Sequence, residues 1–192
     1  TAQVYLANDT ALAPTLRHIL LSPEFAASTG LKLRRPFELV MAAMRSLDSS
    51  IPDDARSGGA NTIRYRLRDL NHAPWTWDQP DGFADEAGPW LSSDGLLERW
   101  AFTSRLANNY FGNDPDDLTT DLSPLVSTAT TVGQLITSLQ DRFGLPGVTQ
   151  PQKDAMTTIL GVSESDPVGS LDQAELGELA GYLLAHPQFQ IR

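Results

Sequence analysis

The chain has 192 residues, no cysteine and a net charge of −10, from 14 basic and 24 acidic side chains. The lack of cysteine excludes disulfides, thiolate metal sites and cysteine nucleophiles. Binding to nucleic acid requires clustered lysine and arginine, so the acidic balance argues against DNA or RNA partners. No run approaches the roughly 20 consecutive apolar residues of a membrane-spanning helix, and we expect a soluble protein.

The charge is unevenly distributed along the chain. Through Arg68 there are nine Lys or Arg against six Asp or Glu, and from Asp69 onward there are five against eighteen. Solvated helix faces and attraction between the two halves explain this pattern, and we favour that interpretation because charge runs usually only keep a protein soluble. The alternative is a basic docking patch. Its candidate residues are Lys32, Arg34, Arg35, Arg64 and Arg68.

Apolar periodicity predicts four helices in the first 111 residues. The first has an apolar stripe at positions 12, 16, 19 and 20 and ends near Pro23. The second begins at Pro36, because proline suits a first helical turn. The third covers about 63–70. The fourth runs from about Asp94 to Phe111, is capped by Ser92 or Ser93, and is expected to bury Leu97, Trp100 and Leu106.

A loop rich in tryptophan and proline, residues 73–91, separates the third and fourth helices. Its rings either fill gaps between helices or stack on a sugar or grip a peptide, with Asp81 and Asp85 as hydrogen-bond acceptors. We favour packing, because a long loop in a compact domain must be held by its own side chains. The rings belong to Trp75, Trp77 and Trp90.

Three further helices are expected after an acidic linker, residues 112–130. Capping boxes mark their starts, at Thr131-x-x-Gln134, Thr149-x-x-Gln152 and Ser170-x-x-Gln173. The sequence therefore predicts an all-α protein, an irregular bundle of about seven helices with little or no β structure. A helical subdomain at 1–111 and a C-terminal three-helix segment at 131–192 would pack together, and all parts could form one domain.

Catalytic and metal-binding patterns are weak. His72 is the candidate general base, with Asp78, Asp81, Asp85 or Glu86 to orient its ring. The acidic run 114–121 supplies oxygen ligands but lacks the glycine of a calcium-binding loop. We therefore predict no metal and no cofactor, and we do not expect an enzyme from this chain alone.

Several segments, in their order and spacing, resemble the C-terminal part of the bacterial DUF1800 family, whose function is unknown. They are Leu20–Phe25, Arg35–Val40 with Met44–Leu47, Pro80–Phe83 leading to Trp90-Leu91-Ser92, Leu96–Arg99 with Ala101-Phe102, and Leu183–Arg192. Phe83 departs from the family, which more often has tryptophan there, and the segment 112–130 does not align.

The resemblance implies a mostly helical fold and a longer parent protein, exported from a bacterial cell. It also implies two partners, the N-terminal half of that parent and a DUF1501-like protein encoded by a neighbouring gene. The start at Thr1 without methionine fits an excised or processed piece.

The function expected from these observations is that of a structural or protein-interaction module. One alternative is the C-terminal part of a hydrolase-like enzyme, with His72 contributing to a site whose catalytic residues lie mainly outside this chain. Another is carbohydrate or peptide binding through the loop 73–91.

Overall fold

The chain is all-α, as predicted. A computed structural model describes residues 1–112 and 114–192, and within them 57% of the chain is helical and no strand forms. The described residues hold ten α-helices where about seven were expected. The additional helices are short, namely α1 (Ala2–Ala7), α3 (Pro23–Ala27) and α7 (Ser123–Val126).

The seven longer helices match the expected ones. They are α2 (Leu12–Leu20), α4 (Pro36–Ser46), α5 (Gly58–Asp69), α6 (Ser93–Ala107), α8 (Val132–Phe143), α9 (Gln150–Leu160) and α10 (Gln173–Ala185). Three 3-10 turns, η1 (Gly88–Trp90), η2 (Val168–Ser170) and η3 (Pro187–Gln190), complete the described helical structure.

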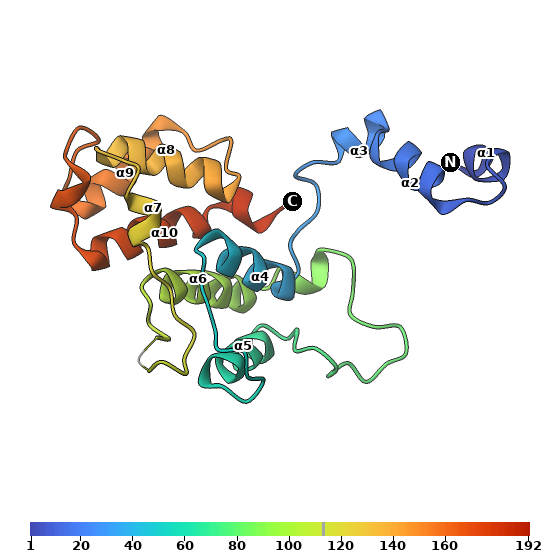
Figure 1. Cartoon of the computed structure of the whole chain (residues 1–192), viewed down its shortest axis with the longest axis horizontal. Coiled ribbons are helices and arrows are strands. Elements are labelled where there is room, and N and C mark those ends of the chain that lie inside the picture. Colours follow the sequence, from blue (N-terminus) through green and yellow to red (C-terminus); the bar gives the residue numbers. More distant parts are fainter. Residues whose placement is uncertain (113) are drawn as a thin grey trace.

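Helices α4 to α10 form the body of the protein (Figure 1). The most extensive packing is between α6 and α10, and α4 packs on α6 while α8 and α9 pack on α10. One apolar core runs through this body and takes residues from both sides of the acidic segment 112–130. Asn113, within that segment, lies outside the described residues. The division into subdomains stays a prediction.

The helix boundaries follow local capping, with two corrections. Ser92 caps α6 by accepting the N–H of Gly95 at 3.0 Å. That helix ends at Ala107 and not near Phe111, because Asn109 turns left-handed with φ 52°. The predicted start of α10 at Ser170 is also wrong. Its cap is Asp172, because Asp172 and Glu175 form the reciprocal capping box.

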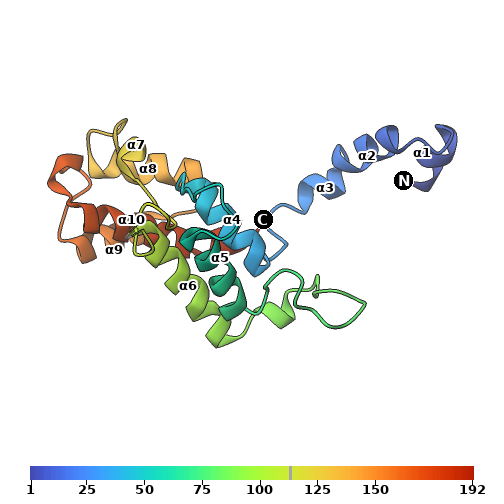
Figure 2. The same cartoon turned by 60° about the horizontal axis from the view of Figure 1, so that its bottom comes forward.

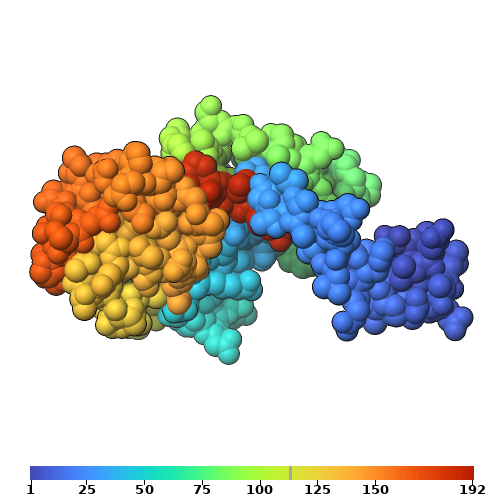
Figure 3. Space-filling model, turned by 90° about the horizontal axis from the view of Figure 1, so that it is seen from above, coloured from blue at the N-terminus to red at the C-terminus, as the bar shows by residue number. Residues whose placement is uncertain are grey.

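Residues 1–31 form an N-terminal arm that projects away from the body (Figures 1 and 2). The arm contains α1, α2 and α3, and none of these helices has a buried residue. In the space-filling view the arm is a separate lobe (Figure 3). The apolar stripe of α2 was correctly predicted as a helix face, but it faces solvent.

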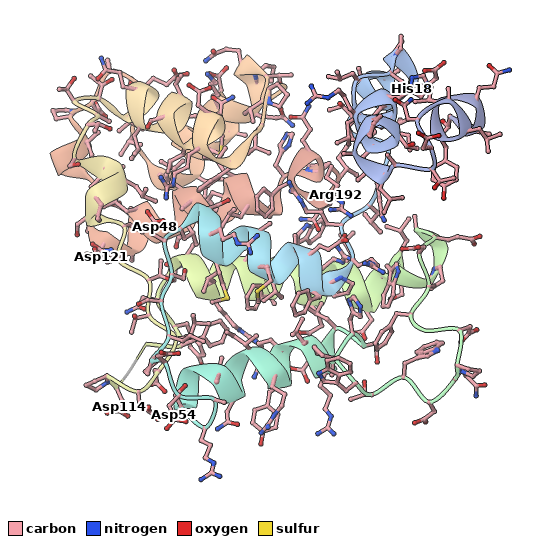
Figure 4. All side chains as sticks on the ribbon, turned by 45° about the vertical axis from the view of Figure 1, so that its right-hand side comes forward. His18, Asp48, Asp54, Asp114, Asp121 and Arg192 are labelled. Atoms are coloured by element: carbon pink, nitrogen blue, oxygen red, sulfur yellow. The ribbon has the colours of Figure 1, made fainter. Side chains whose placement is uncertain are left out.

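Backbone pairing with the end of the chain holds the root of the arm. Lys32 and Arg192 exchange two backbone hydrogen bonds of 3.2 and 2.8 Å, and Leu33 forms an isolated antiparallel bridge with Ile191. The Arg192 side chain reaches Glu38 of α4 at 2.8 Å. Figure 4 shows Arg192 where the arm meets the body and His18 out on the arm. The arm therefore leaves the body from a fixed point.

Candidate functional site

His72 lies at the centre of an aromatic cluster beside the loop 73–91. Its ring centroid is 4.5 Å from that of Phe83 and 4.9 Å from that of Trp90. Its Nδ1 accepts the backbone N–H of Phe37 at 3.1 Å. Burial, with a smaller contribution from nearby Arg35, lowers the pKa of His72 below its ordinary value of 6.5. The lowered pKa and the acceptor role of Nδ1 both favour the neutral imidazole.

Two of the four carboxylates that could orient His72 for catalysis have other partners. Asp81 accepts the indole N–H of Trp77 at 2.9 Å. Asp85 pairs with Arg35 at 3.2 Å and with Lys32 at 3.6 Å. Among the described residues no carboxylate forms a hydrogen bond or an ion pair with His72. The catalytic role of His72 stays a prediction, without the supporting carboxylate that it needs.

The three tryptophans of the loop differ in exposure. Trp90 is 8% exposed and donates its indole N–H to the carbonyl of Ala84 at 3.0 Å, so it packs. Trp77 is 45% exposed, and Trp75 is 99% exposed. Trp75 also has φ 65°, which costs a bulky residue about 1–3 kcal/mol. Packing accounts for Trp90 but not for Trp75.

Helix α6 buries a different face from the expected one. Leu97 is 60% exposed and Trp100 is 40% exposed, so the expectation that they are buried is wrong, whereas Leu106 is buried as predicted. The inner face instead carries Phe102 and Arg99. The guanidinium of Arg99 is buried, which lowers its pKa, and Nη1 donates to the carbonyl of Arg34 at 2.9 Å.

The exposed side of α6 contributes Trp100 to a shallow apolar groove of about 310 Å³ between α6, α9 and α10. Trp100 of α6, Ile159 of α9 and Tyr182 of α10 all line this groove, and all three are exposed. Sequence periodicity places Ile159 on the same apolar face as buried Met156, so its exposure was not foreseen.

The candidate basic patch divides into two parts. Lys32 and Arg35 bind Asp85, and Arg34 donates to the carbonyl of Phe189 with its guanidinium 4.7 Å from the ring centroid of that residue. These three cations stabilise the junction between the halves of the chain, as the favoured interpretation expects. Arg64 and Arg68, on α5, form no ion pair with any described residue.

The acidic segment 112–130 contacts the other end of α5. Asp116 accepts the backbone N–H of Gly58 at 2.8 Å, and Asp54 and Asp114 lie at this same end of the helix (Figure 4). No group of three His, Asp or Glu side chains in the described part of the chain is arranged to hold a metal ion. The carboxylate of Asp116 therefore stabilises the start of α5.

The chain belongs to the DUF1800 family of proteins of unknown function, whose sequence profile matches residues 1–191. No curated protein and no solved structure matches the chain. In the described residues, none of the helices has both the length and the apolar character needed to cross a bilayer.

Proposed function

We propose that this chain is a protein-interaction module and that the N-terminal arm is its main contact surface. The single observation that carries the proposal is the exposure of the large apolar side chains of the arm. Large apolar side chains on the arm meet solvent although the body has a closed core. They are Tyr5, Leu6, Leu12, Leu16, Ile19, Leu20, Leu21, Phe25 and Leu31.

Energetics favour a docked arm. Full burial of one Leu or Ile side chain contributes about 1.5–3 kcal/mol, so covering several of these side chains would contribute strongly to binding. Isolated helices shorter than about 12–15 residues are marginal in water. The arm helices have 6, 9 and 5 residues, so they gain from an apolar partner surface.

The partner that we propose is the N-terminal half of a longer DUF1800-like protein, with a DUF1501-like protein as the second candidate. The proposal requires that this partner cover the apolar stripe of α2. The exposed groove beside Trp100 is a second surface on the body that such a partner would cover.

Binding of the separately expressed N-terminal half, measured by calorimetry, tests this proposal. Leu16→Gln with Leu20→Gln removes two apolar side chains while keeping residues that favour a helix. We expect at least about a 100-fold loss of affinity, because each buried leucine contributes roughly 2 kcal/mol. The matched control is Arg17→Gln with His18→Gln, also on α2 and exposed, which should bind like the unchanged chain.

Two results would contradict the proposal. The unchanged chain could fail to bind both the N-terminal half and the DUF1501-like protein at low salt. Alternatively, the double leucine variant could bind as tightly as the control while retaining its helical circular dichroism.

A further inference from the structure

We propose that the C-terminal half of α5 and the segment 73–76 form a binding site for an acidic stretch of a partner polypeptide. The site is separate from the arm. It joins the unpaired part of the basic patch, Arg64 and Arg68, to the exposed part of the tryptophan loop, Trp75.

The local backbone brings these residues together. Helix α5 ends at Asp69, and Asn71 adopts φ 56°, a left-handed conformation that turns the chain back beside the helix. Buried Ala73 fixes the returning segment, and the Thr76 hydroxyl donates to the Ala73 carbonyl at 2.8 Å. The resulting pocket has a volume of about 370 Å³. Its lining is Arg64, Tyr65, Arg68, Ala73, Pro74 and Thr76.

The positive charge of this pocket is not neutralised within the described chain. The neighbouring carboxylate of Asp69 pairs with Arg66 at 2.9 Å. Arg64 is positioned by neutral groups, since Nη2 donates to Asn61 at 2.6 Å and the guanidinium lies 5.7 Å from the Tyr65 ring centroid. Asp54 and Asp114 lie at the opposite end of α5 (Figure 4). An anionic ligand would therefore complete the site.

The spacing of the arginines matches an extended acidic peptide. Residues four apart on a helix have Cβ atoms about 5–6 Å apart. Alternate side chains of an extended strand point the same way about 6.6 Å apart. A segment of the form acidic-x-acidic can therefore present one carboxylate to Arg64 and the next to Arg68, each in the paired geometry that guanidinium favours.

Exposed aromatic rings near the arginines indicate which side chains the peptide would carry next to its acidic residues. Tyr65 lines the pocket, and Trp75, which is 99% exposed, lies in the sequence between the lining residues Pro74 and Thr76. Both rings could contact a proline or apolar side chain next to the acidic residues of the ligand. A short peptide brings few charges, whereas a nucleic-acid strand would meet the overall charge of −10 along its phosphates. The observations therefore favour a peptide.

Fluorescence anisotropy with a fluorescein-labelled peptide, Gly-Glu-Ala-Glu-Pro-Gly, tests the site on the full chain at about 50 mM salt. The comparison peptide has glutamine in place of both glutamates. We expect saturable binding of the acidic peptide, at least about tenfold tighter than the neutral one. Arg64→Gln with Arg68→Gln should weaken it by roughly tenfold, and Trp75→Ala by about threefold.

A matched variant separates this site from general electrostatics. Arg45→Gln with Arg56→Gln makes the same change in net charge at two exposed arginines whose side chains form no ion pair or hydrogen bond with any described residue. It should bind the acidic peptide like the unchanged chain. Equal weakening by both double variants would overturn the proposal. So would equal binding of the two peptides, or tighter binding of a single-stranded oligonucleotide that depends on Arg64 and Arg68.

The outcome is independent of the arm. The leucine variant of α2 should retain the acidic peptide, so loss of partner binding in that variant and loss of peptide binding in the α5 variant report on different surfaces.

Discussion

At the scale of single residues, buried polar groups hold together segments that are distant in the sequence. His72 connects the end of α5 to the start of α4 by accepting from Phe37, and Arg99 connects α6 to the root of the arm through the Arg34 carbonyl. The His72 contact needs an unprotonated Nδ1, and the Arg99 contact needs a guanidinium N–H. Protonation of Nδ1 in His72 would replace the acceptor with a donor and break its hydrogen bond.

The lowered pKa of His72 predicts a pH dependence of stability. The unfolded chain has a histidine pKa near 6.5, so as pH falls below that value the unfolded state binds a proton that the folded state excludes. The urea midpoint of unfolding should therefore fall between about pH 7 and pH 5. His186, whose pKa is also lowered by burial, should act in the same direction.

Replacing His72 by Asn retains an acceptor for the Phe37 N–H and removes the titration. Urea unfolding followed by circular dichroism at several pH values should show a smaller fall for this variant. For the double variant His72→Asn with His186→Asn, the urea midpoint should change even less between about pH 7 and pH 5. A double variant with the full pH dependence of the unchanged chain would show that the carboxylates account for it.

Residue patterns explain part of the site. The favoured interpretation, that the loop tryptophans pack, is confirmed for Trp90 and wrong for Trp75, which is 99% exposed. Nothing in the sequence indicated that Arg99 would be buried, because its interior partners, the Arg34 carbonyl and Gln190, come from segments far away in the chain. A charged residue is placed inside by tertiary contacts that periodicity does not contain.

At the scale of elements, the close approach of α6 and α10 depends on glycines within α10. A Cβ placed on Gly177 would be 3.0 Å from the Asn108 Cα, and one on Gly181 would be 3.3 Å from the Ser104 Cα. Glycine inside a helix ordinarily lowers stability by roughly 1 kcal/mol relative to alanine. Here it allows the two backbones to approach.

We therefore expect Gly177→Val to lower the free energy of unfolding by about 1–3 kcal/mol, because the added methyl groups must displace the end of α6. Gly169→Val is the control, since a Cβ there has no atom within 4 Å. The control should change stability by less than about 0.5 kcal/mol. Urea denaturation measures both, and equal values for the two variants would remove the packing argument.

Periodicity predicted the longer helices but not always the faces that they bury. On α6 both sides carry large apolar residues, Leu97 and Trp100 on one and Phe102 and Leu106 on the other. Which side is buried depends on where α10 lies. The start of α10 was misplaced because Ser170 and Asp172 both begin plausible capping boxes, and the structure uses the acidic one.

At the scale of the whole molecule, an arm without a core of its own extends from a packed body. The order of the segments was readable from the sequence, and the family resemblance is confirmed by the match over residues 1–191. The position of the arm was not readable. An amphipathic stripe indicates that a helix buries one face, but it does not say whether the covering surface belongs to the same folded body.

Limited proteolysis should separate the arm from the body. Trypsin is expected to cut first after Arg17, because α2 buries no residue and can open locally at little cost. Mass spectrometry of early time points should show this cut well before any cut after buried Arg99. Simultaneous cleavage at both sites would mean that the body opens as readily as the arm, and addition of the N-terminal half should protect Arg17.

The pairing of Lys32 with Arg192 anchors the base of the arm to a segment that is far from it in the sequence. This pairing sets the direction in which an arm of about thirty residues leaves the body. Loss of this pairing would free the base of the arm while leaving its apolar face unchanged. The arm would then present the same apolar side chains to a partner in many orientations, because its direction relative to the body would no longer be fixed.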